Sequence, residues 1–95
     1  MLEALELQKL AKKIVEKRLP SIHLDEVRTL PFTDSDGEAA VRITLVLTPE
    51  TADAISGEDS LKLLVAIREA LSRKGEDRFP IVEYATADDV PYEED

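Results

Sequence analysis

The segment Ala39–Thr48, AAVRITLVLT, has the clearest strand pattern in the chain and fixes the centre of the predicted fold. Its odd-numbered positions from Ala39 to Leu47 are all apolar, and the even-numbered ones include an arginine and two threonines. Such alternation is typical of a strand with one buried face. Val46 falls on the second face, which indicates that part of that face is covered as well.

Directly after this strand, Thr48–Asp59 reads TPETADAISGED and contains two helix starts. Thr48 is a suitable N-cap and Pro49 a suitable first helical residue, so we expect a short helix over 49–55. Gly57 then ends it. Apolar residues three and four apart predict a longer helix over 59–74, followed by a glycine. Its candidate caps are Ser56, Asp59 and Ser60.

Two further elements flank this central part. Ala4, Leu7 and Ala11 begin an apolar stripe that predicts a helix over 2–18, with glutamates near its start and basic residues at its end. At the other end of the chain, residues 79–86 have the β-branched and aromatic content of a third strand.

The segment before the central strand predicts a hairpin. The apolar alternation changes phase near Asp25 and Glu26, which indicates a bulge, so we expect regular strand from Glu26 onward. Asp34–Gly37, with the sequence DSDG, is a turn signal between the two strands.

The predicted order is therefore α-β-β-short α-α-β, an α+β fold in one domain over residues 1–86. We expect a small three-stranded mixed sheet with its helices packed on one face. The third strand returns through a helix, so it is expected to lie parallel to one of the first two. The strand order stays open. Residues 87–95 are predicted to form a flexible acidic tail.

Over residues 2–86 this order resembles the type II KH fold and the BolA family that shares it. The resemblance to KH domains implies nucleic-acid binding through a GXXG turn between the two central helices. Here that position reads SGEDS, residues 56–60, with one glycine and two carboxylates. Each carboxylate would repel a nearby phosphate by roughly 1–4 kcal/mol. A KH-like or BolA-like regulatory domain associated with nucleic acid is thus the alternative, carried by Lys9, Lys12, Lys13 and Lys17.

Charge also favours a protein partner. The chain has 95 residues and a net charge of −9, and residues 83–95 hold six of its 21 acidic side chains but none of its 12 Lys and Arg. A chain of this balance is a poor non-specific binder of nucleic acid, so a basic protein is the expected partner. The absence of cysteine and of any long apolar run favours a cytoplasmic protein with no membrane segment.

No residue pattern predicts a catalytic, metal or cofactor site, so we expect no enzyme activity. His23 is the only histidine, and beside Asp25 it is interpreted as a surface residue. Asp34, Asp36 and Glu38 alternate as in a calcium loop, but the positions where that loop needs its first and last ligands are Phe32 and Ile43.

The sequence thus predicts a non-catalytic, acidic protein-protein interaction module, such as a neutralising or regulatory partner of a basic protein. The tail contains two apolar anchors among its acids, and such segments dock on basic grooves. Self-association through a sheet edge or face, with Leu30 and Val46, is a further expectation. The candidate partner-binding residues are Val90, Tyr92, Asp88, Asp89, Glu93 and Glu94.

Overall fold

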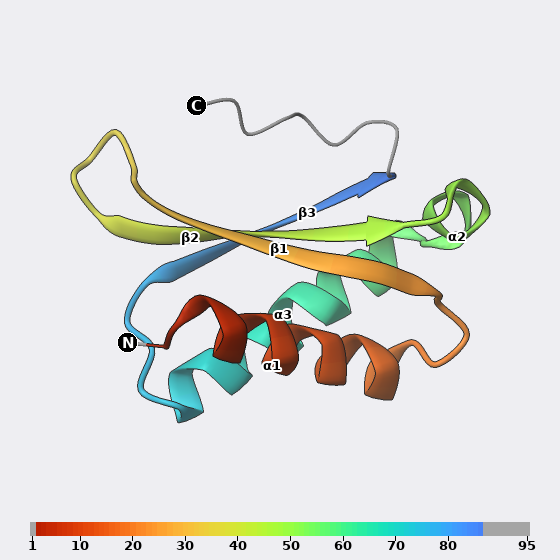
Figure 1. Cartoon of the computed structure of the whole chain (residues 1–95), viewed down its shortest axis with the longest axis horizontal. Helices are drawn as coiled ribbons and strands as arrows, with labels where there is room; N and C mark the ends of the chain where they lie inside the picture. The colour runs from red at the N-terminus through yellow and green to blue at the C-terminus, as the bar shows by residue number, and fades with distance from the viewer. Residues whose placement is uncertain (1, 87–95) are drawn as a thin grey trace.

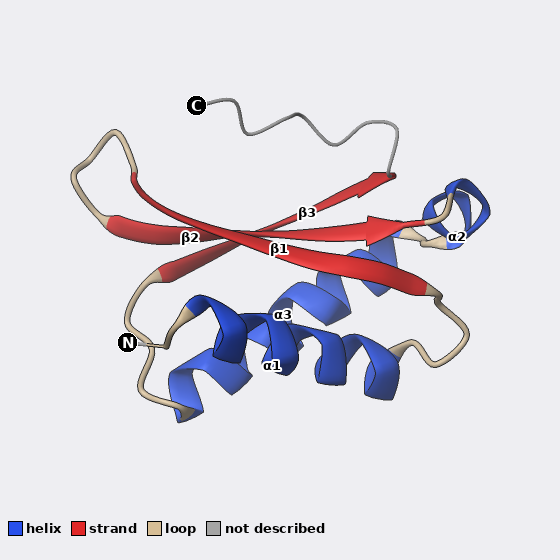
Figure 2. Cartoon of the chain, in the orientation of Figure 1, coloured by secondary structure: helices blue, strands red, loops and turns tan. Residues whose placement is uncertain are grey.

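The computed structural model describes residues 2–86, which form a sheet with its two long helices packed on one face (Figure 1, Figure 2). The α+β class and the predicted order of elements are confirmed. The elements are α1 (Ala4–Arg18), β1 (Leu24–Thr33), β2 (Ala39–Leu47), α2 (Pro49–Ala54), α3 (Gly57–Arg73) and β3 (Phe79–Thr86).

The sheet is mixed, with the strand order β1-β2-β3. β1 and β2 are antiparallel, as the predicted hairpin requires, and β3 runs parallel to β2. The register is irregular between Leu24 and Glu26, where the change of phase predicts a bulge. β1 nevertheless begins at Leu24, two residues earlier than expected, because Leu24 still pairs with Leu47 across the irregularity.

Local capping explains where the hairpin and the short helix begin and end. Gly37 adopts a φ of 84°, a conformation that favours glycine, and its N–H donates to the Asp34 carbonyl at 3.0 Å. Thr48 is the N-cap of α2, and its hydroxyl accepts a hydrogen bond from the Thr51 N–H at 3.2 Å. Both features are those that the sequence predicts.

The core lies between the sheet and the two long helices. Val41, Ile43 and Leu45 of β2 face it and are at most 1% exposed. α1 and α3 each contribute one buried stripe with the three-and-four spacing of an amphipathic helix. These stripes consist of Leu7, Ala11 and Val15 in α1 and Leu63, Ile67 and Leu71 in α3. Among residues 2–86, no helix is both long and apolar enough to cross a bilayer.

Candidate protein-interaction site

The predicted partner-binding residues, Asp88, Asp89, Val90, Tyr92, Glu93 and Glu94, lie outside the described residues. The structure therefore gives only the place where their segment joins the domain. β3 ends at Thr86, and this end of the strand lies beside α2 (Figure 1).

The end of the domain that carries α2 and the start of α3 is acidic. Glu50, Asp53 and Glu58 are exposed, and Asp59 is partly exposed. Of these four, only Glu58 has an ion pair among the described residues, with Lys62 at 3.3 Å. The Lys62 ammonium offsets the charge of Glu58, so Glu50, Asp53 and Asp59 are the carboxylates of this end without an ion pair in residues 2–86. This end of the domain therefore presents carboxylates close to Thr86, where β3 ends.

The turn between α2 and α3 is short and capped. Ser56 is the N-cap of α3, and its hydroxyl accepts a hydrogen bond from the Asp59 N–H at 3.0 Å. The helix therefore starts at Gly57, two residues earlier than the predicted start at 59. One of the N–H groups that a helix start leaves without a backbone partner is therefore already bound to the Ser56 hydroxyl. The carboxylates of Glu58 and Asp59 in the first turn would also repel a phosphate, so the turn disfavours phosphate binding.

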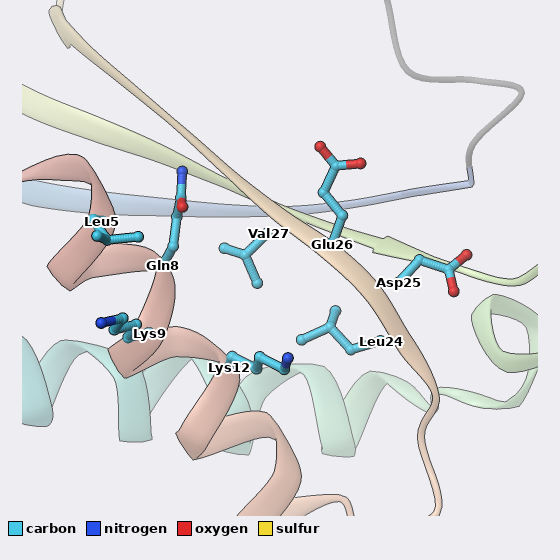
Figure 3. Close-up of a pocket in the computed structure, with 8 residues that line it drawn as sticks. All are labelled: Leu5, Gln8, Lys9, Lys12, Leu24, Asp25, Glu26 and Val27. Carbon is cyan, nitrogen blue, oxygen red and sulfur yellow. The ribbon is translucent and has the colours of Figure 1, made fainter.

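A groove of about 350 Å³ runs between α1 and β1 (Figure 3). Leu24 and Val27 point from β1 toward α1 and form its apolar side, together with the exposed Leu5 of α1. Gln8, Lys9 and Lys12 line the helix side. The sequence does not predict this groove, because the groove depends on how closely α1 packs beside the edge strand β1.

The charges around the groove differ in how they are paired. The carboxylates of Asp25 and Glu26 point away from α1 in Figure 3. Asp25 contacts His23 at 3.1 Å, and Glu26 accepts a hydrogen bond from the Arg28 Nε at 2.8 Å. Neither Lys9 nor Lys12 has an ion-pair partner within residues 2–86. The groove thus combines three apolar side chains with two lysines on its helix side that have no described ion-pair partner and two paired acidic residues on its strand side.

The two polar patterns weighed from the sequence have structural explanations. His23 is exposed, with 72% of its side-chain surface accessible, and it does not line the α1–β1 groove that Asp25 borders. In the hairpin, one oxygen of the Asp34 carboxylate accepts hydrogen bonds from the N–H groups of Asp36 and Glu38, each at 2.9 Å. Within the described part of the chain, no three His, Asp or Glu side chains are grouped to hold a metal ion.

A buried ion pair after α3 was not predicted. The Glu76 side chain is 0% exposed and that of Arg78 is 9% exposed, and the Arg78 Nε donates to Glu76 at 2.9 Å. The same two side chains also form hydrogen bonds with the backbone of Leu2. The Leu2 N–H donates to Glu76 at 2.7 Å, and the Leu2 carbonyl accepts from Arg78 at 2.7 Å. This clamp fastens the N-terminal segment to the α3–β3 connection.

The sheet face opposite the helices carries the residues expected to support self-association. No described helix lies over this face (Figure 2). Leu30 is 44% exposed there, but Val46 is only 2% exposed, so Val46 offers almost no surface to a partner. Its burial agrees with the predicted cover of the second face. Two charge contacts, Arg28 with Glu26 and Arg42 with Glu83, cross the same face.

In comparisons of this chain with protein-family models, curated proteins and solved structures, no match was found.

Proposed function

We propose that this protein is a non-catalytic interaction module that binds a basic protein in the cytoplasm through its acidic C-terminal end. Residues 87–95 are the primary contact in this proposal, with Val90 and Tyr92 as apolar anchors. Their acidic neighbours contact the cationic surface of the partner. In this way the module would neutralise or regulate a basic protein.

The observation that carries this proposal is the acidic character of the domain at the place where the tail leaves it. Glu50, Asp53 and Glu58 are exposed on α2 and the start of α3, beside the end of β3. Residues 87–95 add five acidic side chains and no cation to this end. A concentration of one sign of charge steers an oppositely charged protein toward the surface and speeds its association.

A second candidate function is association with nucleic acid. The α-β-β-α-α-β order resembles KH and BolA domains, and the α1 residues Lys9, Lys12, Lys13 and Lys17 have no ion-pair partner within residues 2–86. The capped and acidic α2–α3 turn disfavours nucleic-acid binding, because this turn lies where a KH domain binds phosphates. The exposed sheet face around Leu30 is the surface we propose for any self-association.

Affinity purification of the tagged full chain from its own cells tests the two candidates together. We expect a basic protein to co-purify with the full chain. Its recovery should fall at least tenfold with a variant in which Asp88, Asp89, Glu93 and Glu94 are changed to the corresponding amides. A tenfold loss corresponds to about 1.4 kcal/mol, a modest demand on four charged contacts.

The matched control changes Glu3, Glu16, Asp36 and Glu38 to amides, which removes the same charge from exposed positions away from the acidic end. Equal recovery of the partner by both variants would contradict the proposal. Recovery of RNA or DNA with the full chain, lost on raising the salt concentration, would support the second candidate in its place.

A further inference from the structure

We propose that the α1–β1 groove binds the acidic C-terminal segment of the same chain, residues 87–95. The proposal concerns a site on the domain and does not depend on the identity of any external partner. It gives the tail two alternative docking surfaces, one on its own domain and one on the basic protein.

The groove has the chemistry to receive such a segment. Its apolar side consists of Leu5, Leu24 and Val27, and Leu5 is 60% exposed. Lys9 and Lys12 line its helix side and have no ion-pair partner in residues 2–86. Asp25 and Glu26 line its strand side, but their carboxylates point away from α1 (Figure 3). An occupant that fits must therefore place apolar side chains on one side and carboxylates toward α1.

Residues 87–95, ADDVPYEED, carry these features in the necessary order. Val90 and Tyr92 supply apolar side chains around a proline, and Glu93, Glu94 and Asp95 follow as three consecutive acids. With the anchors against Leu24 and Val27, the final acids would reach Lys12 and Lys9. Both ion contacts and the burial of apolar surface would then form together.

The reach of the chain permits this contact within one molecule. Thr86 pairs with Leu47, and Leu47 pairs with Leu24, so the end of β3 and the start of the groove lie in one row across the sheet. Two strand spacings separate them, which is about 10 Å. Nine residues extend to at most about 30 Å, which leaves roughly 20 Å of chain to run along the groove.

Tethering makes a weak contact sufficient. A segment joined to its site by a short linker has an effective concentration in the millimolar range, so a contact with a dissociation constant near 1 mM already fills about half of the grooves. Exposed ion contacts weaken as salt screens them. A basic partner that binds the same acidic side chains would compete with the groove for the tail and would leave the groove empty.

Paramagnetic relaxation enhancement tests the proposal on the full chain. The protein has no cysteine, so a single cysteine added after Asp95 carries a nitroxide label at one defined position and keeps every acid of the segment. A docked tail should broaden the amide signals of Leu5 and Gln8 more strongly than those of Leu61 and Val65 on α3. An undocked tail, tethered at Thr86 beside α2, should instead broaden the α2–α3 end, including Leu61, and leave Leu5 sharp.

Charge reversal on α1 provides the matched controls. In the labelled chain, the double substitution Lys9→Glu and Lys12→Glu should raise the intensities of the Leu5 and Gln8 amide signals at least twofold. Lys13→Glu with Lys17→Glu makes the same change of charge on the same helix outside the groove, and should leave the broadening in place. An equal effect of both pairs of substitutions would overturn the proposal.

Two measurements need no substitution in α1. Raising the salt concentration to about 1 M shortens the Debye length to about 3 Å and should weaken the broadening at Leu5. Mixing the spin-labelled chain with an isotope-labelled chain that lacks the nitroxide should leave Leu5 of the latter sharp. Broadening in the mixed sample would assign the groove to the tail of a second copy and would overturn intramolecular docking. Failure of any of these tests leaves the co-purification result unaffected.

Discussion

The Arg78→Met variant is expected to lose about 3–5 kcal/mol of its free energy of unfolding, because the substitution leaves a buried carboxylate without its cation. The Glu76 side chain is 0% exposed, and Arg78 donates hydrogen bonds to both of its oxygens. The substitution also removes the donor to the Leu2 carbonyl. Small domains are stable by about 5–15 kcal/mol in total, so this one change threatens the fold.

The matched control for this variant is Arg73→Met. Arg73 lies 4.0 Å from Glu69 in a pair whose side chains are 78% and 59% exposed. Loss of such an exposed pair should cost at most about 0.5 kcal/mol. Urea denaturation followed by circular dichroism measures both variants. Equal stability of the two would show that Glu76 and Arg78 do not form a buried pair.

The same clamp gives the protein a dependence of stability on acid. The hydrogen bonds from Arg78 lower the pKa of Glu76 from 4.5 to about 2; burial acts in the opposite direction, and the Leu2 N–H adds to the lowering. Because the folded-state pKa is the lower one, the ionised carboxylate stabilises the fold fully above pH 4.5. That contribution, roughly 3 kcal/mol, is lost as the pH falls from 4.5 toward 2.

The Glu76→Gln variant isolates this contribution. It cannot ionise at position 76, so between pH 4.5 and pH 2 its unfolding free energy should fall less steeply than that of the unsubstituted chain. Parallel denaturation curves at several pH values in this range provide the measurement. Identical slopes for the two proteins would place the acid sensitivity in other carboxylates.

The second large effect is expected for Leu45→Ala, which should destabilise the protein by about 2–5 kcal/mol. Leu45 is 1% exposed in the central strand and faces both long helices. Truncating the Leu45 side chain removes buried apolar surface and leaves a cavity between the sheet and the helices, and both effects lower the free energy of unfolding.

Leu30→Ala is the control, since it makes the same chemical change on the opposite face of the sheet. Leu30 is 44% exposed, so its truncation should cost only about 1 kcal/mol. Thermal unfolding of both variants gives the comparison. A loss at Leu30 as large as that at Leu45, and dependent on protein concentration, would instead show that the exposed face is buried in a self-association interface.

The parts of the fold that follow from local chemistry were predictable from the sequence. Alternation identifies β2, capping by Thr48 locates the start of α2, and a change of phase locates the irregularity near Asp25. The spacing of apolar residues identifies α3, but three candidate caps left its start two residues late. The pairing partner of β3 was not predictable, because an alternating pattern specifies a buried face but not a neighbouring strand.

The clamp and the groove could not be predicted for a related reason. Glu76 binds the Leu2 N–H across 74 positions of sequence, and a glutamate and an arginine two residues apart in a polar stretch are typical of an exposed loop. The groove exists because α1 packs beside β1, so its lining comes from two separate segments. The candidate residues of the tail came from composition alone, and they stay a prediction.

The most direct test of the proposed function is a calorimetric titration of the purified basic partner into the full chain and into the variant with Asp88, Asp89, Glu93 and Glu94 changed to amides. The proposal predicts saturable binding by the full chain and at least a tenfold higher dissociation constant for the variant, with the difference shrinking at high salt. Equal dissociation constants at low salt would contradict it, because binding would then depend on surfaces other than the acidic tail.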